Sequence, residues 1–218
     1  MPRKENFEER PISSRRLEAF TDGVFAIAAT LLVLDLSVDT LGKGIHTDAE
    51  LWKALGGMSN EFLSFAISFL IMGLLWSVHT WQFEYVDHVT HTLATMNTIR
   101  LFGVVLVPFT TSLNSTYSEL VLGRLLLPLN FLFVILLGTI QWYYATSSKR
   151  GLVTRLSPDE IRSTRIGSIA AVFSSVAVVI LAPFFGPWAF FAFFLNFAFE
   201  AAAGRIRPPR LRRDDRPA

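Results

Sequence analysis

Residues 17–38 read LEAFTDGVFAIAATLLVLDLSV, and this stretch decides how the rest of the chain must be arranged. Its uncharged run covers only residues 23–34, because Glu18, Asp22 and Asp35 interrupt or flank the apolar sequence. A helix surrounded by lipid needs roughly 20 apolar residues, and charges at membrane depth usually point into a bundle or a wet cavity. The segment is therefore predicted to be a helix that packs inside a membrane protein and lines something.

The remainder of the chain has the composition of a membrane protein. Of its 218 residues, 51% are hydrophobic and 17% are charged, whereas a water-soluble domain has about 25% charged residues. Hydropathy predicts an all-α membrane protein with six transmembrane helices, over residues 17–38, 62–81, 97–113, 120–144, 166–185 and 188–203. The sequence APFFGPW at residues 182–188 predicts a tight hairpin between the last two. The expected division is a cytoplasmic segment at 1–16, a six-helix domain at 17–204 and a basic cytoplasmic tail at 205–218.

The basic residues predict an orientation for these helices. All of the 20 Lys and Arg residues except Lys43, Lys53 and Arg124 fall on one side of the predicted membrane. The positive-inside rule therefore predicts a multi-pass protein of the cell membrane with both termini in the cytoplasm. The basic tail is interpreted as an orientation and headgroup-binding segment, and no nucleic-acid partner is expected. The absence of cysteine excludes disulfides and thiolate metal sites.

The first helix has two distinct faces when it is drawn at 3.6 residues per turn. One stripe contains Arg16, Phe20, Gly23, Ile27, Thr30, Leu31, Leu34 and Val38. The opposite stripe contains Asp22, Ala26, Ala29, Val33 and Leu36. Small residues let neighbouring helices approach closely, so the second stripe is predicted to pack against the protein's own bundle. The first stripe is then either an ordinary packing seam or, when repeated around a symmetry axis, a stack of apolar rings.

Several motifs resemble those of a known family. Residues 16–27, RLEAFTDGVFAI, resemble the signature Arg-x-x-x-Phe-Ser-Asp of the transmembrane protein 175 family of potassium channels, with Thr21 in place of the serine. Trp76-x-x-His79, Asn97 and the pair Pro108 and Phe109 extend the resemblance to about residue 110.

The resemblance implies a homotetrameric, potassium-selective channel in which the first helix of each subunit lines a central pore without a carbonyl filter. It implies apolar constrictions at Ile27, Leu31 and Leu34, and a selectivity role for the hydroxyl of Thr30. A supporting polar network, rather than a set of ion ligands, is implied for Arg16, Phe20, Thr21, Asp22, Trp76, His79 and Asn97. The expected partners are further copies of the chain, the lipid bilayer and potassium ions, with no cofactor and no resident metal.

Other interpretations of the same residues remain open at this stage. Asp22 and His79 could form the relay of a proton- or ion-coupled transporter, and facing histidines could hold a haem. His88 and His91, with Glu84 and Asp87 nearby, could bind a divalent metal, although an exposed loop is the simpler interpretation. Within the network, either His79 or the indole of Trp76 is expected to satisfy the Asp22 carboxylate. No catalytic motif is recognised, so the chain is not expected to be an enzyme.

Overall fold

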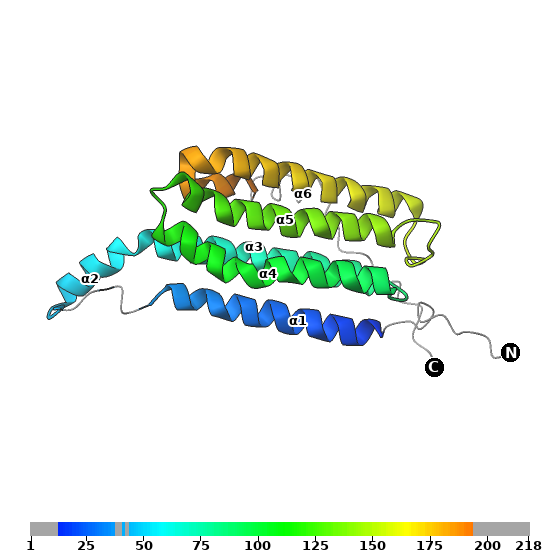
Figure 1. Cartoon of the computed structure of the whole chain (residues 1–218), viewed down its shortest axis with the longest axis horizontal. Helices are drawn as coiled ribbons and strands as arrows, with labels where there is room; N and C mark the ends of the chain where they lie inside the picture. Colours follow the sequence, from blue (N-terminus) through cyan, green and yellow to red (C-terminus); the bar gives the residue numbers. More distant parts are fainter. Residues whose placement is uncertain (1–12, 38–40, 42–43, 194–218) are drawn as a thin grey trace.

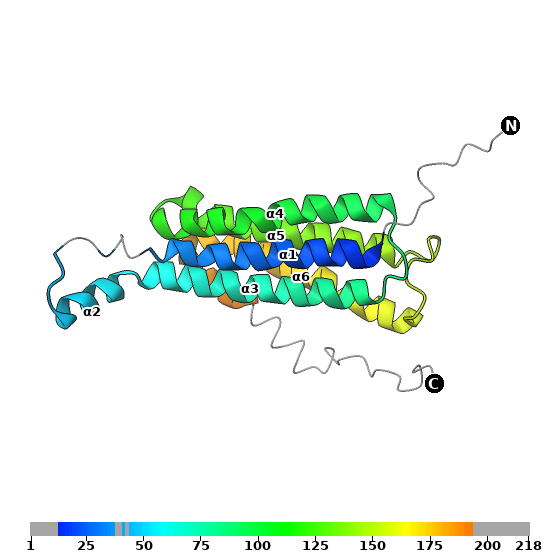
Figure 2. The same cartoon turned by 90° about the horizontal axis from the view of Figure 1, so that it is seen from below.

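The computed structural model describes residues 13–37, 41 and 44–193, and the regular structure of this part is helical. Its long helices lie side by side in an antiparallel bundle (Figure 1). They are α1 (Ser14–Leu31), α3 (Ser59–Glu84), α4 (His91–Thr116), α5 (Val121–Ala145) and α6 (Pro158–Phe185). Helices α3 and α4 occupy the middle of the bundle, whereas α1 lies at one edge and α6 at the opposite edge (Figures 1 and 2). The all-helical prediction is confirmed for the described residues.

The described part contains five helices that are long and apolar enough to cross a membrane. Helix α1 continues through the 3-10 turn η2 (Leu32–Asp35), and the candidate span that begins with α6 extends to Phe193. We call the end where α1, α4 and α6 begin and α3 and α5 end the basic end. Among the described residues it carries Arg15, Arg16, Lys149, Arg150, Arg155, Arg162 and Arg165. The structure thus supports a multi-pass membrane protein, with the alternating helix directions that the sequence predicts.

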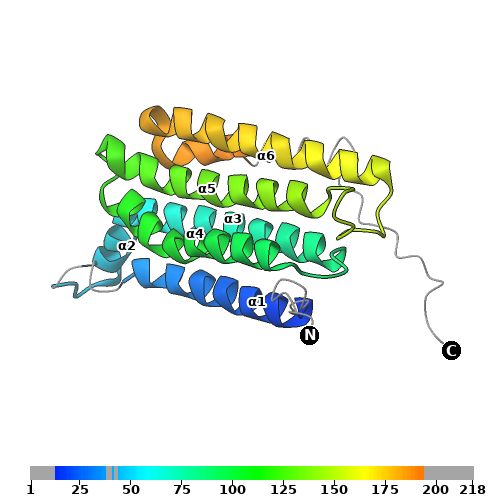
Figure 3. The same cartoon turned by 45° about the vertical axis from the view of Figure 1, so that its right-hand side comes forward.

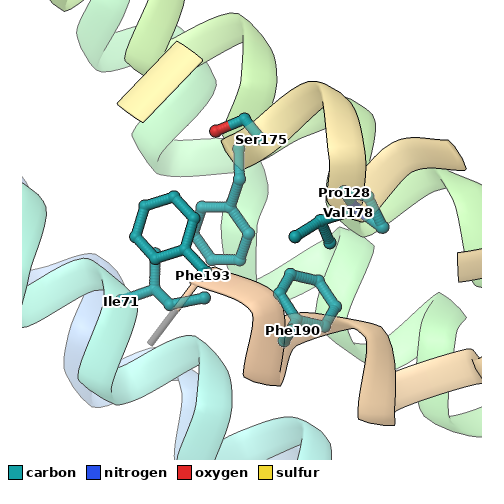
Figure 4. A pocket seen from close by; sticks show the side chains of 7 residues that line it. Ile71, Pro128, Ser175, Val178, Phe190 and Phe193 are labelled. Carbon is teal, nitrogen blue, oxygen red and sulfur yellow. The ribbon is translucent and has the colours of Figure 1, made fainter. Parts of the chain in front are cut away.

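The predicted hairpin after α6 is present as far as the chain is described. Gly186 adopts a φ of +55°, which favours glycine, and the 3-10 turn η4 (Gly186–Phe190) leads the chain back beneath α6 (Figure 3). Phe190 and Phe193 then line a space of only about 10 Å³ beside Ile71 and Val178 (Figure 4). This volume is at the lower limit for one water molecule, so these side chains close the packing. The rest of the predicted sixth helix, residues 194–203, lies outside the described residues.

A short helix, α2 (Asp48–Gly57), was not predicted from the sequence. Its start carries a capping box, in which Thr47 accepts a hydrogen bond from the Glu50 amide and Glu50 accepts one from the Thr47 amide. Such a pattern is a recognisable signal for a helix start, so residues 47–50 were sufficient to predict that a helix begins there. Helix α2 extends beyond the bundle and leans toward the edge formed by α1 (Figure 1).

Hydrogen bonds between polar side chains hold the central helices together. Ser68 of α3 bonds Thr111 of α4 at 2.8 Å, and Asn114 donates to Ser64 at 3.1 Å. On the other side of α4, Asn130 of α5 donates to the carbonyl oxygen of Gly103 at 3.1 Å. Lipid offers no hydrophobic drive for two apolar helices to associate, so such bonds and close packing supply the stability.

A clasp between two loops closes the basic end. Asp87 follows α3, and its carboxylate accepts hydrogen bonds from the Thr154 amide at 3.1 Å, the Thr154 hydroxyl at 2.5 Å and Arg155 Nε at 3.2 Å. Partial burial raises the pKa of Asp87, but the Thr154 hydrogen bonds and the Arg155 charge outweigh it and hold the pKa below its usual value. These contacts fix the end of α3, the helix that carries Trp76 and His79 of the site described below.

Because the Asp87 carboxylate is charged in these contacts, we expect the free energy of unfolding to fall at acidic pH. A carboxylate whose pKa is lowered on folding stabilises the protein above its unfolded pKa of about 4, and this stabilisation is lost as the pH falls through the lower folded value. Asp87→Asn should therefore lower the free energy of unfolding by about 1 kcal/mol at pH 7, measured by denaturation in detergent micelles. The difference between variant and parent should shrink below about pH 4. A difference that does not change from pH 7 to pH 3 would contradict the proposed role of the charge.

Candidate functional site

Helix α1 lies in the groove between α3 and α4 (Figure 2). The buried residues of α1 and the following turn η2 are Thr21, Phe25, Ala28 and Leu32, which recur at intervals of four, three and four residues and so share one face. The predicted packing face was therefore wrong: Asp22, Ala26 and Val33 are exposed, and Ala29 and Leu36 are half-buried. Volume explains the difference, because the groove between α3 and α4 takes the large side chains of Phe25 and Leu32 together with the smaller Thr21 and Ala28.

The predicted apolar stripe faces away from the bundle. Ile27, Leu31 and Leu34 have exposed fractions of 63%, 42% and 68%. Thr30 is also exposed, and its hydroxyl donates to the Ile27 carbonyl oxygen at 2.8 Å, so the oxygen lone pairs stay available on the outer surface. The structure thus presents the stripe as a free surface of the single chain.

Two separate polar contacts fix the rotation of α1. The Trp76 indole of α3 donates to Asp22 Oδ1 at 2.9 Å. From α4, Asn97 Nδ2 donates to the Thr21 hydroxyl at 2.8 Å, and Gln141 of α5 donates to Asn97 Oδ1 at 3.4 Å. Of the two partners considered for Asp22, the structure therefore selects Trp76. Thr21 and Asn97, two further residues of the predicted network, are joined to each other by the second contact.

His79 has a different partner from the one predicted. Its Nδ1 atom lies 2.9 Å from a guanidinium nitrogen of Arg100. Arg100 is only 2% exposed, and its guanidinium lies so close to α5 that a Cβ added at Gly138 would be 3.0 Å from its central carbon. A guanidinium can only donate, so Nδ1 must accept and the ring proton sits on Nε2.

Sequence reasoning missed this use of Arg100. It counted the residue only among the basic residues that orient the chain. The signal that was present is its spacing of three residues from Asn97, which puts both on one face of a helix. The predicted network members Arg16 and Phe20 lie exposed at the outer surface of α1.

A recess opens between α1 and α3 near the basic end. It has a volume of about 190 Å³ and is lined by Glu18, Asp22, His79, Thr80 and Glu84. Three acidic side chains around one opening attract cations. Among the described residues, however, no group of three or more His, Asp or Glu side chains is arranged to hold a metal ion. His88 and His91, which were considered as metal ligands, are both exposed.

The following known proteins, to which this chain is similar, are all named as ion channels. The family model described as "Endosomal/lysosomal potassium channel TMEM175" matches residues 16–108. A potassium channel of Streptomyces collinus is 41% identical over 105 residues, which are 48% of each chain. A potassium channel of Chamaesiphon minutus is 32% identical over 149 residues, 67% of this chain and 72% of that one. Vertebrate relatives, such as the chicken protein, are named endosomal/lysosomal proton channel TMEM175.

A solved structure matches most of the fold. The crystal structure of a lysosomal potassium-selective channel TMEM175 homolog from Chamaesiphon minutus has a TM-score of 0.71 and 25% identity, and the match covers 89% of this chain and 98% of that one. By contrast, the sequence match spans only about half the length of the Streptomyces relative. Apolar spans and buried polar contacts between them define the class as a multi-pass helical membrane protein.

Within that class, the chain belongs to the TMEM175 family. This is a family of ion channels and not of enzymes. The expectation that the chain is not an enzyme is therefore confirmed, as is the resemblance that its motifs carried.

The revised partner of Asp22 can be tested by double-mutant cycles. Asp22→Ala and Trp76→Phe should show a coupling of about 1 kcal/mol in the free energy of unfolding, because each change removes the same hydrogen bond. Asp22→Ala and His79→Phe serve as the control pair. Their coupling should be clearly smaller than that of the first pair, because they line the same recess but no hydrogen bond joins them. Equal coupling in both cycles would show that His79, too, supports Asp22.

Proposed function

We propose that the chain is a subunit of a homotetrameric, potassium-selective channel whose pore is lined by four copies of α1. The observation that carries the proposal is the exposed stripe of Ile27, Leu31 and Leu34 on a helix that also carries the exposed Asp22 and the half-buried Glu18. Carboxylates that are not fully buried make this edge of the bundle a poor surface for lipid. A single helix cannot enclose a pore, so self-association is part of the mechanism.

The chemistry of the stripe suits a narrow pore. Four copies of Ile27 form an apolar ring that limits conduction by dewetting or by occlusion. Thr30 adds an oxygen between these apolar layers, where it helps to select potassium over sodium. At the basic end, Glu18, Asp22 and Glu84 raise the local concentration of cations beside α1. In this proposal the permeating ion is potassium, because both bacterial relatives are named potassium channels.

The proposed setting is the cell membrane, with the basic end of the bundle in the cytoplasm. Support comes from the positive-inside rule, since the described part outside that end contains only Lys53 and Arg124 besides the buried Arg100. Both termini would then be cytoplasmic. The basic tail at 205–218 lies outside the described residues.

A proton- or ion-coupled transporter that uses Asp22 and His79 is a weaker proposal. A relay requires His79 to accept a proton at a free ring nitrogen, but Nδ1 already accepts from Arg100. Protonation there would place two cations face to face in a buried position. Proton conduction without coupling is a separate possibility, because the vertebrate relatives are named proton channels.

The channel proposal predicts the effect of hydrating the Ile27 ring. In liposomes loaded with potassium, Ile27→Asn should raise basal potassium flux several-fold, because amide groups favour water in the constriction. Ile180→Asn is a matched control: it makes the same change at an isoleucine on α6 that is 61% exposed, compared with 63% for Ile27, and it should leave the flux unchanged.

The flux assay also separates the alternatives. A channel gives potassium flux that follows the electrical gradient without a proton gradient. Obligatory exchange of protons for potassium would indicate the transporter, whereas proton flux without potassium flux would indicate a proton channel. Equal effects of Ile27→Asn and Ile180→Asn would contradict a constriction at Ile27.

A further inference from the structure

The edge of the bundle formed by α6 combines a long apolar stripe with basic residues at one end. The exposed members of the stripe are Ile166, Ile169, Phe173, Val176, Ile180 and Phe184. At 100° per residue they all lie within about 60° of Arg162, so one line of the helix carries a cation followed by apolar side chains. From Arg162 to Phe184 this line extends about 33 Å, which matches the hydrocarbon thickness of about 30 Å.

Arg165 is held in place beside Arg162 by contacts with α5. Its Nε atom donates to the Thr146 hydroxyl at 2.9 Å, and its guanidinium carbon lies 4.7 Å from the centre of the Tyr143 ring. Thr146 is buried and its hydroxyl in turn donates to the Trp142 carbonyl oxygen at 2.7 Å. The guanidinium therefore keeps two terminal nitrogens for an external acceptor in a preorganised geometry.

No carboxylate neutralises these two arginines within the part of the chain that the structure describes. The ion pairs found there belong to Arg124 and Arg155. Asp159 and Glu160 lie in the first turn of α6. Glu160 accepts hydrogen bonds from the amide and hydroxyl of Ser157 in the α6 capping box. Arg162 and Arg165 thus retain their full positive charge at the level where α6 enters the membrane.

From this arrangement we infer that α6 carries a binding site for an anionic phospholipid in the leaflet at the basic end. Arg162 and Arg165 bind the headgroup phosphate, and the acyl chains lie along Ile166, Ile169 and Phe173. A phosphate suits the site because a guanidinium offers parallel donors that match its oxygens, and basic residues beside an apolar helix attract anionic headgroups. A free anion would contact the arginines but not the apolar side chains that follow them along the same line of α6.

The position of α6 agrees with this occupant. Helix α6 lies at the opposite edge of the bundle from α1 (Figures 1 and 3), so self-association through α1 leaves α6 at the periphery, facing lipid. The site does not depend on ion conduction. A failure of the lipid experiment would therefore leave the proposed function intact, and a failure of the flux assay would leave the lipid site intact.

Lipid binding by the purified full chain tests the inference. Native mass spectrometry in detergent would compare phosphatidylglycerol with phosphatidylcholine of the same acyl chains. The anionic lipid should bind more tightly, and Arg162→Gln and Arg165→Gln should each weaken it about fivefold, the contribution of one basic residue near the membrane surface. Arg165→Lys should also weaken binding, because lysine keeps the charge but not the stacked, two-pronged geometry.

The matched control is Lys149→Gln, which removes an exposed cation at the same end of the bundle but outside the α6 line. It should change the affinity less than twofold. Equal losses for Lys149→Gln and both arginine variants would mean diffuse charge attraction and would overturn the site. Equal binding of the two lipids would overturn it as well. Displacement of phosphatidylglycerol by millimolar inorganic phosphate would reassign the arginines to a free anion and overturn the assignment to lipid.

Discussion

Inside a membrane, a polar side chain must find its partner within the protein, and this constraint sets the rotation of α1. Thr21 bonds Asn97 of α4, and Asp22 bonds Trp76 of α3. These two contacts involve adjacent residues of α1 but reach different helices, so together they fix the rotation of α1 in the groove. Phe25, Ala28 and Leu32 then fill the groove below them. The outward direction of Ile27 follows from these contacts rather than from any property of Ile27 itself.

The same constraint makes the two edges of the bundle chemically different. At the α1 edge, carboxylates and a hydroxyl accompany the apolar stripe, which suits contact with other copies of the chain and with water. At the α6 edge, the exposed line is apolar from Ile166 to Phe184, and the basic residues lie before Ile166 at the start of the helix. This arrangement suits contact with lipid. Between the edges, the buried pair of Arg100 and His79 joins α4 to α3, with Gly138 of α5 leaving room for the guanidinium. In the proposed tetramer, the α1 edge would face the pore and the α6 edge would face lipid.

The sequence predicted the long helices and the hairpin at Gly186, because both depend on local patterns. A short motif narrowed the partner of Asp22 to Trp76 or His79, and the structure decided between them. The prediction from sequence misplaced the packing face of α1 by about a quarter turn. Periodicity identifies stripes, but the volume of the receiving groove decides which one is buried, and that volume belongs to α3 and α4. It also left His79 without its partner, because Arg100 was counted with the basic residues that orient the chain although it shares a helix face with Asn97. Helix α2 was missed although its capping box was present.

Cysteine accessibility along α1 tests the central claim most directly, and the chain suits the experiment because it contains no native cysteine. Single substitutions Ile27→Cys, Leu31→Cys and Leu34→Cys, compared with Phe25→Cys, Ala28→Cys and Leu32→Cys, would be treated with a charged, membrane-impermeant thiol reagent while potassium flux is recorded. Modification should change the flux for the first three variants and leave it unaltered for the last three. If the first three prove inert, as a lipid-facing control at Ile180→Cys should, α1 does not line a water-filled path and the proposed pore is contradicted.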